Sequence, residues 1–385
     1  MSCIYFDNSA TTRVCSEAAE AARIAMCENF GNPSSLHLLG VNASRTLQQS
    51  REDIASLIGA SPEEIYFTSG GTESNNIAIN GAAAVYAKKG RRILILDTEH
   101  SSVIKPARNL SENGVELEFL PVDSLGLIDM EAFLAKLADD VILVSVQYVN
   151  SETGIIQPIG EIGRILRERG ILFHTDAVQA VGKLPVLLKS LPVDILSASG
   201  HKLHAPKGVG FLYVRKAVRL SPRISGGGQE NNLRSGTENV PGIAGLSAAV
   251  RKAAAEMEVR SKNVRAVRES LLAGISSIQG IRINSDTEYS LPYVLNVSFP
   301  GVRSEILLHY LEEKGIFVSS GSACSARSKK GSPVLRAMGL GVDFVDSAIR
   351  FSFCGDNTVE EAATVVAATV AAVGEVRALT GWRQK

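Results

Sequence analysis

The chain has 385 residues, of which 45% are hydrophobic and 21% charged, and its 40 basic side chains equal its 40 acidic ones. This length can bury the cores of one large and one smaller domain, and zero net charge argues against nucleic acid or an anionic membrane as a direct partner. The five scattered cysteines include no Cys-x-x-Cys pair. The start lacks a signal peptide, and no run approaches the ~18 apolar residues of a membrane span. We therefore expect a soluble cytoplasmic protein with no intrinsic metal site.

The first two thirds of the chain predict an α/β domain behind an N-terminal arm at 1–14. Helical patterns extend to about residue 28 and over 42–58. Short apolar strands then alternate with amphipathic helices: strands at 65–68, 92–96, 115–120, 141–146, 171–174, 193–198 and 210–214, and helices at 75–88, 101–113, 130–137 and 159–168. This pattern predicts a mostly parallel sheet between helices, in a large domain at 15–255. Ligands of such sheets bind beyond the carboxyl ends of the strands.

The last third of the chain predicts a smaller α+β domain at 256–385. The alternation of strands and helices stops at three consecutive glycines, 226–228, and a long helical region follows at about 240–278. Beyond it we expect strands at 294–299, 317–319 and 349–353, and helices at 305–312 and 358–379.

A lysine in a tight turn between two apolar strands is the strongest chemical signal. Lys202 lies between the predicted strands at 193–198 and 210–214, three residues after Ser199. Apolar surroundings disfavour a charged lysine, and a neutral amine is what a Schiff base with an aldehyde requires. Asp176 lies at the end of an earlier strand, where a carboxylate can pair with a pyridinium nitrogen. Lys202 alone would more often be an ordinary surface residue, but the pair favours pyridoxal phosphate as cofactor.

A glycine-rich turn at 69–72 lies between a predicted strand and a predicted helix. Its glycines let the backbone approach a phosphate, and the amides at the helix start favour the anion. No Lys-Ser or Lys-Thr follows the glycines, so a nucleotide is the less favoured ligand. Alone, the turn is equally an ordinary helix start. With Lys202 and Asp176 it completes a phosphate cup.

Two further side chains stand where they can complete the site. His100 follows the strand at 92–96, where it can stack on the pyridine ring and exchange protons, although a lone histidine in a loop is usually solvated or capping. Arg350 lies in the predicted strand at 349–353 between apolar residues. Such an arginine is either part of a structural ion pair or a bidentate clamp for a carboxylate, and the sequence leaves both open.

One cysteine differs from the others in its surroundings. Cys324 lies among small and polar residues, and three cations follow it closely at Arg327, Lys329 and Lys330. Positive surroundings lower the pKa of a thiol and favour the nucleophilic thiolate. Most free cysteines are inert core residues, and the basic cluster can equally be solvated surface. We interpret the remaining cysteines as structural: Cys3, Cys15, Cys27 and Cys354.

Seven motifs, in order along the chain from about residue 4 to about residue 375, resemble those of the cysteine desulfurases, in the class V branch of the fold-type-I pyridoxal-phosphate enzymes. They are DNSATT at 7–12, GNPSSLH at 31–37, TSGGTESN at 68–75, HTDAVQ at 174–179, SGHK at 199–202, RSGT at 234–237 and SGSAC at 320–324. The segment after Cys324 resembles the housekeeping group of that family. The resemblance implies an aminotransferase-like fold whose small domain is joined by the arm and carries the cysteine loop.

The resemblance also implies a role for each candidate residue. Lys202 holds pyridoxal phosphate, Asp176 pairs with its pyridine nitrogen, and Gln179 bonds its ring hydroxyl. His100 stacks on the ring and takes part in catalysis. The phosphate is held by Gly71, Thr72, Ser199 and His201, joined by Thr237 from the partner subunit. Asn150, which also contacts the cofactor, and Arg350 bind the substrate carboxylate, with Asn32 nearby. Cys324 receives the sulfur.

The implied activity removes sulfur from L-cysteine, giving L-alanine and a persulfide on Cys324. A homodimer and a sulfur-accepting protein are implied as well, such as an iron–sulfur scaffold or a tRNA thiolation enzyme, and Cys324 would ligate a cluster only transiently. A selenocysteine lyase shares every cofactor residue but needs no attacking thiol, so Cys324 favours desulfuration without excluding the lyase. An aminotransferase of the same fold leaves the cysteine loop unexplained, and Lys202 and Asp176 argue against a non-catalytic scaffold.

Overall fold

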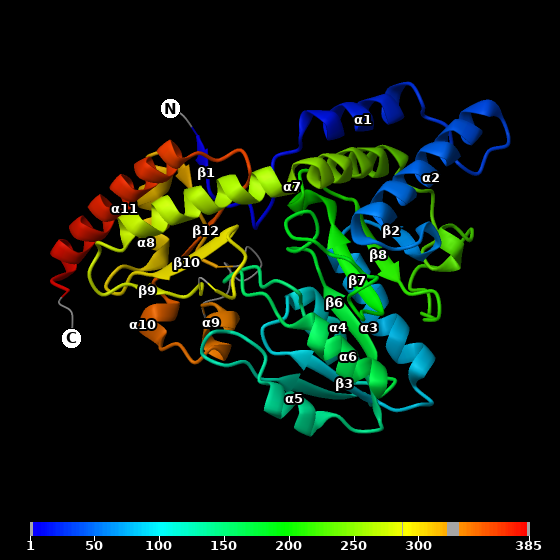
Figure 1. Ribbon diagram of the computed structural model, residues 1–385, viewed down its shortest axis with the longest axis horizontal. Helices are drawn as coiled ribbons and strands as arrows, with labels where there is room; N and C mark the ends of the chain where they lie inside the picture. Colours follow the sequence, from blue (N-terminus) through cyan, green and yellow to red (C-terminus); the bar gives the residue numbers. More distant parts are fainter. Residues whose placement is uncertain (1–2, 287, 322–330, 383–385) are drawn as a thin grey trace.

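The computed structural model describes residues 3–286, 288–321 and 331–382. Within 65–214 the strands form a seven-stranded sheet in the order β2-β8-β7-β6-β5-β3-β4. Neighbouring strands from β4 to β7 run parallel, while β8 is antiparallel to both β7 and β2 (Figure 1). The strands are β2 (Ile65–Thr68), β3 (Arg92–Leu96), β4 (Glu116–Leu120), β5 (Val141–Ser145), β6 (Leu172–Asp176), β7 (Ile195–Ser199) and β8 (Gly210–Val214). The predicted mostly parallel sheet is confirmed.

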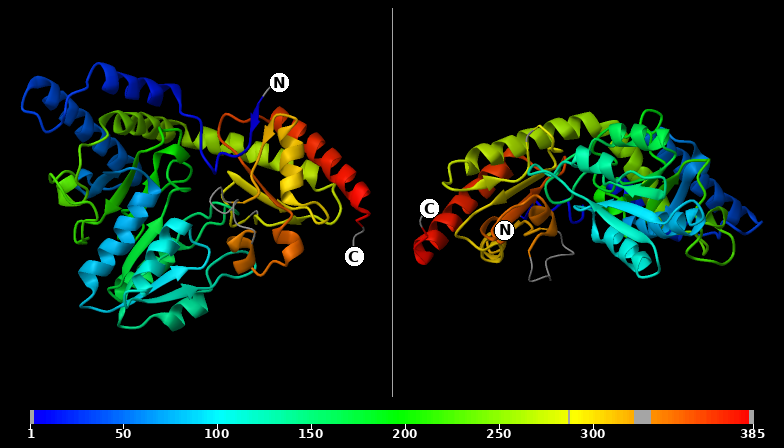
Figure 2. Two further views of the ribbon diagram at one scale, coloured as in Figure 1. Left: turned by 180° about the vertical axis from the view of Figure 1, so that it is seen from behind. Right: turned by 90° about the horizontal axis from the view of Figure 1, so that it is seen from below.

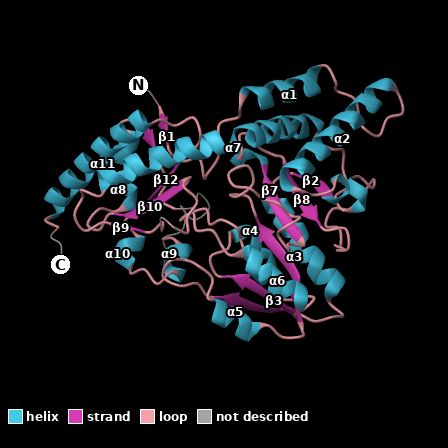
Figure 3. Cartoon of the chain, in the orientation of Figure 1, coloured by secondary structure: helices cyan, strands magenta, loops and turns pink. Residues whose placement is uncertain are grey.

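Alternate side chains of each central strand enter two different cores, because successive residues of a strand point to opposite faces. Ile93 and Ile95 pack with helices α3 and α4, whereas Leu94 and Leu96 belong to the core shared with α2, α6 and α7. Figures 2 and 3 show these helices on either side of the sheet. The helices of the large domain are α1 (Ser16–Cys27), α2 (Leu38–Ile58), α3 (Gly71–Tyr86), α4 (Ser101–Ser111), α5 (Met130–Lys136) and α6 (Ile159–Glu168).

The long helix α7 (Val240–Ile275) joins the two parts of the molecule (Figure 1). It packs against α1 and α2 in the large domain and against α11 in the small one. The expected domain boundary at residue 255 therefore falls inside a continuous helix, and the domain ranges 1–14, 15–255 and 256–385 stay predictions.

The small domain is built on an antiparallel sheet in the order β12-β10-β9. The N-terminal arm joins it, because β1 (Ile4–Tyr5) pairs in parallel with β11 (Ile316–Phe317) and Asp7 bridges to Ser352 of β12. Its remaining elements are β9 (Arg282–Ile283), β10 (Val294–Ser298), β12 (Ala348–Ser352), α8 (Ser304–Glu312), α9 (Pro333–Ala337), α10 (Val342–Val345) and α11 (Val359–Thr380).

Helix α11 is long and apolar enough, by length and composition alone, to cross a membrane. By this test of length and composition, the expectation that no segment approaches a membrane span was wrong. In the fold α11 packs against α7 and α8, and one stripe of it is buried: Ala362, Val365, Ala368, Thr369, Ala372, Val373 and Val376. All of these side chains except Thr369 belong to the main hydrophobic core.

Two helices begin earlier than their sequence patterns indicate. Helix α2 begins at Leu38, where the His37 ring accepts a hydrogen bond from the Gly40 N–H as its N-cap. Helix α3 begins at Gly71 instead of residue 75. The glycine-rich turn therefore provides the first turn of α3, which places free backbone N–H groups at the turn itself.

Candidate active site

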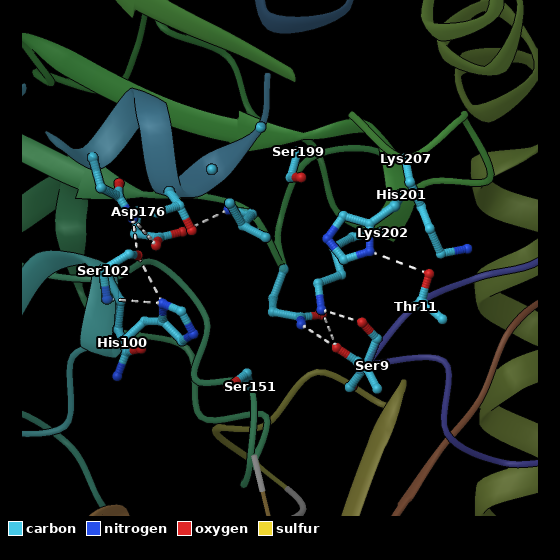
Figure 4. Close-up of a pocket in the computed structure, with 18 of the residues that line it drawn as sticks. Ser9, Thr11, His100, Ser102, Ser151, Asp176, Ser199, His201, Lys202 and Lys207 are labelled. Carbon is cyan, nitrogen blue, oxygen red and sulfur yellow. Dashed lines mark hydrogen bonds between the residues drawn. The ribbon is translucent and has the colours of Figure 1, made fainter. Parts of the chain in front are cut away.

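A cavity of about 500 Å³ lies at the carboxyl edge of the large sheet, within the size range of small-molecule sites (Figure 4). Strands β2, β3, β5, β6 and β7 all end at this edge because β8 is the only strand of that sheet that runs against them. The cavity wall brings together most of the residues singled out from the sequence: Gly71, Thr72, His100, Asp176, Gln179, Ser199, His201, Lys202 and Arg350.

Lys202 reaches the cavity from a short 3-10 turn, Gly200–Lys202, that follows β7. Its Nζ donates to the carbonyl oxygens of Ser9 at 2.5 Å and Ala10 at 2.7 Å, both in the N-terminal arm (Figure 4). The turn is closed by the Leu203 N–H, which donates to the Gly200 carbonyl. The arm and the turn together fix the amine at the cavity wall.

Asp176, at the end of β6, is anchored from two sides. Its Oδ2 accepts from Asn75 Nδ2 at 2.7 Å, and its Oδ1 accepts from the Val178 N–H at 3.0 Å. Asn75 Nδ2 also donates to Ser102 Oγ at 2.8 Å. Both Asp176 and Asn75 are buried, so the carboxylate is held in one orientation beside the cavity.

His100 continues this network from the N-terminus of α4. Its Nδ1 lies 2.7 Å from Ser102 Oγ and accepts from the Ser102 N–H at 3.2 Å. Burial lowers the pKa of His100; the Asp176 charge opposes this shift and Lys202 adds to it. Because Nδ1 accepts the backbone bond, the neutral ring carries its proton on Nε2. The capping role left open by the sequence is therefore observed, on a residue that also lines the cavity.

The β2–α3 turn has the shape of an anion cradle. Gly70 has φ 148°, and a Cβ there would lie 3.3 Å from Ser199 Oγ, while a Cβ on Gly71 would lie 2.7 Å from Val178 Cγ2. Only glycine leaves this space open, at the positive N-terminal end of a 16-residue helix. The residues present thus fit a phosphate group at this end of the cavity.

His201 lies beside the cradle with its Nδ1 3.2 Å from Thr11 Oγ1 (Figure 4). Burial, and after it the nearby cations Lys202, Lys207 and Lys183, lower the pKa of His201 to about 4. The ring is therefore neutral at physiological pH and can present one N–H to an anion without adding charge.

A layer of buried polar groups lies behind Asp176. Ser145 Oγ donates to Glu99 Oε1 at 3.0 Å and lies 2.8 Å from His174 Nδ1, and His174 Nε2 lies 3.0 Å from Ser197 Oγ. Burial and then the Asp176 charge raise the pKa of Glu99 well above its usual value. Burial lowers the pKa of His174 to about 3. Both shifts favour the uncharged form of the group.

Arg350, on β12, reaches the cavity from the small-domain side and is 1% exposed. Its Nη2 donates to Asp7 Oδ1 at 2.7 Å and its Nη1 to the Ser151 carbonyl at 3.1 Å. Among the described residues, no group accepts from its buried Nε. The ion pair that the sequence left open is therefore present, and the guanidinium keeps donor capacity for a carboxylate.

Some predicted site residues lie elsewhere. Asn150 is buried in its own turn, where Oδ1 accepts from the Glu152 and Thr153 N–H groups at 2.8 and 2.9 Å. Neither it, nor Asn32, nor Thr237 is among the described residues that line the cavity, so their expected roles stay predictions. Cys324 lies outside the described residues. Within the described part of the chain, no cluster of three His, Cys, Asp or Glu is placed to hold a metal ion.

Several wall residues were not assigned a role from the sequence. Asn75 and Ser102 carry the link from Asp176 to His100, yet single polar residues on helices give no pattern of their own. Asn75 lies within the TSGGTESN motif and the arm residues within the DNSATT motif, so the family resemblance is the signal that could have pointed to them. Apart from Ser69 and Gly70 of the glycine-rich turn, the further lining residues are Ser9, Ala10, Thr11, Glu73, Gln147, Val149, Ser151, Val178, Lys207 and Gly208.

Comparison with known proteins places the chain among relatives over nearly its whole length. Residues 4–365 match the family described as aminotransferase class-V. The chain is 44% identical over 382 residues to the cysteine desulfurase IscS of Salmonella arizonae, covering 98% of this chain and 94% of that one. It is 43% identical over 358 residues to the protein of the same name from Methanosarcina thermophila, covering 93% and 89%.

Two solved structures are similar to it throughout. A NifS-like protein superimposes with a TM-score of 0.90 at 38% identity, covering 99% of this chain and all (100%) of that one. The structure described as SspA in complex with cysteine has a TM-score of 0.82 at 34% identity, covering 91% and 98%.

Proposed function

This chain belongs to the aminotransferase class-V family and is a pyridoxal-phosphate-dependent cysteine desulfurase, and we propose that the cavity at the carboxyl edge of its large sheet is the active site. One observation carries the proposal: Lys202, Asp176 and Arg350, from three separate strands or strand ends, line the same cavity. An amine, a buried carboxylate and a buried guanidinium are the groups that a pyridoxal enzyme acting on an amino acid requires.

Pyridoxal phosphate, when bound, supplies an aldehyde for covalent linkage to an amine and a ring that withdraws electrons from the substrate. Lys202 would carry it, and the same amine, when free of that linkage, would take the α-proton of the substrate. Asp176, fixed by Asn75, would pair with the pyridine nitrogen and hold a proton there. Gln179 would bond the ring hydroxyl, and the α3 N-terminus with Ser199 and His201 would hold the phosphate.

The substrate side of the reaction requires a clamp and a nucleophile. Arg350 binds the α-carboxylate of L-cysteine through donors that Asp7 and Ser151 leave available. The Cys324 thiolate attacks the substrate sulfur, so a sulfur–sulfur bond forms while the carbon–sulfur bond breaks. The electron pair of the broken bond and one proton stay with the carbon skeleton. The products are L-alanine and a persulfide on Cys324.

We propose a homodimer in which Thr237 completes the phosphate site of the partner subunit. Thr237 follows Arg234, whose Nε donates to Glu73 Oε1 at 2.9 Å near the start of α3. The segment around the α1–α2 loop exposes apolar side chains of the kind that interfaces bury: Met26, Phe30, Leu36 and Leu38. Mixed dimers of Lys202→Ala and Thr237→Ala subunits should retain cofactor differently from either parent. A fully active monomer would contradict the dimer.

The sulfur on Cys324 requires an acceptor outside the cavity. We propose a protein acceptor, either an iron–sulfur scaffold or an enzyme of tRNA thiolation, and a cytoplasmic location. The free state of the described cysteines, Cys3, Cys15, Cys27 and Cys354, supports a reducing compartment.

The role of Cys324 is tested by Cys324→Ser, with Cys27→Ser as the exposed control. The serine variant should bind cofactor and respond spectrally to L-cysteine like the wild type. Its alanine production should fall more than about 100-fold, because a hydroxyl is a far poorer nucleophile toward sulfur. Mass spectrometry of the wild type after cysteine treatment should find one added sulfur on the Cys324 peptide. A Cys324→Ser enzyme as fast as the wild type would favour the selenocysteine lyase.

A further inference from the structure

Lys183 is a buried lysine behind the cavity wall, four residues after Gln179. Its Nζ donates to Gln179 Oε1 at 2.7 Å. Gln179 Nε2 in turn donates to the Ser9 carbonyl at 3.0 Å, the same oxygen that accepts from Lys202 Nζ. A continuous run of hydrogen bonds therefore joins Lys183 to Lys202.

The surroundings of Lys183 do not supply a structural reason for its charge. It lines a second small cavity of about 20 Å³ at the junction of the two domains, and its Nζ lies 5.8 Å from the centre of the Tyr293 ring. Among the described residues it forms no salt bridge with a carboxylate. A buried amine without such a partner is costly. The ionisable groups that face it are Lys202, Arg350, Arg260, Cys354, His204 and the Tyr293 hydroxyl.

The contact with Lys183 dictates how the Gln179 amide is turned. An ammonium group only donates, so the end of the amide that faces Lys183 is the oxygen. The amide nitrogen must then point the other way, toward Ser9 and the active-site cavity that Gln179 lines. One of its hydrogens bonds the Ser9 carbonyl, and the second is available to an acceptor inside the cavity.

We propose that Lys183 is a positioning residue for the cofactor: it orients and polarises the Gln179 amide so that its N–H stabilises the ionised ring hydroxyl. This inference rests on the proposed function, in which pyridoxal phosphate is carried on Lys202. A charge-assisted bond at the amide oxygen strengthens the N–H as a donor. A stabilised ring anion holds the proton of the Lys202 linkage less tightly. Burial, and after it the neighbouring cations Lys202 and Arg350, lower the pKa of Lys183 to about 7, so the charge-assisted bond is strongest below that pH.

The test is a pH titration of the visible absorbance of the holoenzyme. Lys183→Met keeps the length of the side chain and removes the donor, so the midpoint should rise by about 1 pH unit. Lys189→Met, the same change at an exposed lysine six positions along the chain, should leave the midpoint unchanged. Lys183→Gln, which keeps an uncharged donor, should give a smaller rise and provides the measurement if the methionine variant does not fold.

A double-mutant cycle separates the amide from a simple effect of charge. In a Gln179→Leu background, Lys183→Met should shift the midpoint by less than a third of its shift in the wild-type background. A full shift in that background, or no shift in folded Lys183→Met and Lys183→Gln, would overturn the inference. A wild-type holoenzyme with no visible band of a Lys202 linkage would instead contradict the proposed function.

Discussion

Two walls of the active site hold their polar groups in different ways. The cofactor wall, made of Asn75, His100, Ser102 and Asp176 on the large sheet and its helices, is linked side chain to side chain. The substrate wall is centred on Arg350, which the N-terminal arm holds through Asp7. In the cofactor wall Asn75 Nδ2 donates to both Asp176 and Ser102, and Asn75 Oδ1 is the atom left without a donor; in the substrate wall the Arg350 Nε has no acceptor among the described residues. The cofactor wall is therefore preorganised, and the substrate wall keeps donor capacity for an incoming anion.

The largest effect is expected at the substrate wall. Arg350→Leu removes the proposed carboxylate clamp, so KM for L-cysteine should rise about 100-fold while cofactor binding is retained. Arg303→Leu, at an exposed arginine of the same domain, is the matched control. Steady-state kinetics and the absorbance of the purified holoenzyme measure the two quantities. A variant that loses cofactor but keeps its KM would show that Arg350 belongs to the cofactor wall and would contradict the proposed clamp.

At the cofactor wall we expect a smaller effect, and we expect it on cofactor retention instead of KM. Asn75→Leu removes the bonds to Asp176 and Ser102, so cofactor should dissociate about 10-fold more readily with little change in KM. Asn76→Leu is the control, because the Asn76 side chain bonds the Thr72 carbonyl of its own helix. Dialysis followed by absorbance gives the retained fraction. Equal cofactor retention in the two variants would show that Asp176 does not depend on this network.

The two walls also differ in how far the sequence predicts them. Alternating apolar strands and helices predict the sheet, and the position of Lys202 and Asp176 at strand ends then predicts that they meet at one edge. The order of the strands is not encoded in this pattern, nor is the reach of Asp7 across 343 positions to Arg350. Contacts between residues so distant in sequence depend on packing, which no local pattern records. Elements of two to five residues, such as β1 and α9, are likewise too short for periodicity.

The smallest effect is expected in the buried layer behind the cofactor wall, where burial lowers the pKa of His174 from its usual 6.5 to about 3. Between these values the unfolded chain binds a proton that the native state does not, so stability falls as the pH falls through this window. From pH 6.5 to 5.5 this histidine should cost about 1 kcal/mol of unfolding free energy.

His174→Gln should remove that part of the pH dependence, whatever its own stability at neutral pH. His309→Gln, at an exposed histidine, should keep the wild-type dependence on pH. Urea unfolding of the three proteins at both pH values compares the slopes. A His174→Gln protein with the wild-type slope would show that the buried ring is not the group that titrates.

The central claim is that Lys202, fixed by the arm at the edge of the large sheet, carries the cofactor. Borohydride reduction of the holoenzyme followed by peptide mapping tests it most directly, because reduction makes the linkage permanent. The account predicts a pyridoxyl group on the peptide that contains Lys202, and no covalent label in Lys202→Ala. A label on Lys183, Lys207 or any other lysine, or undiminished labelling of Lys202→Ala, would contradict it.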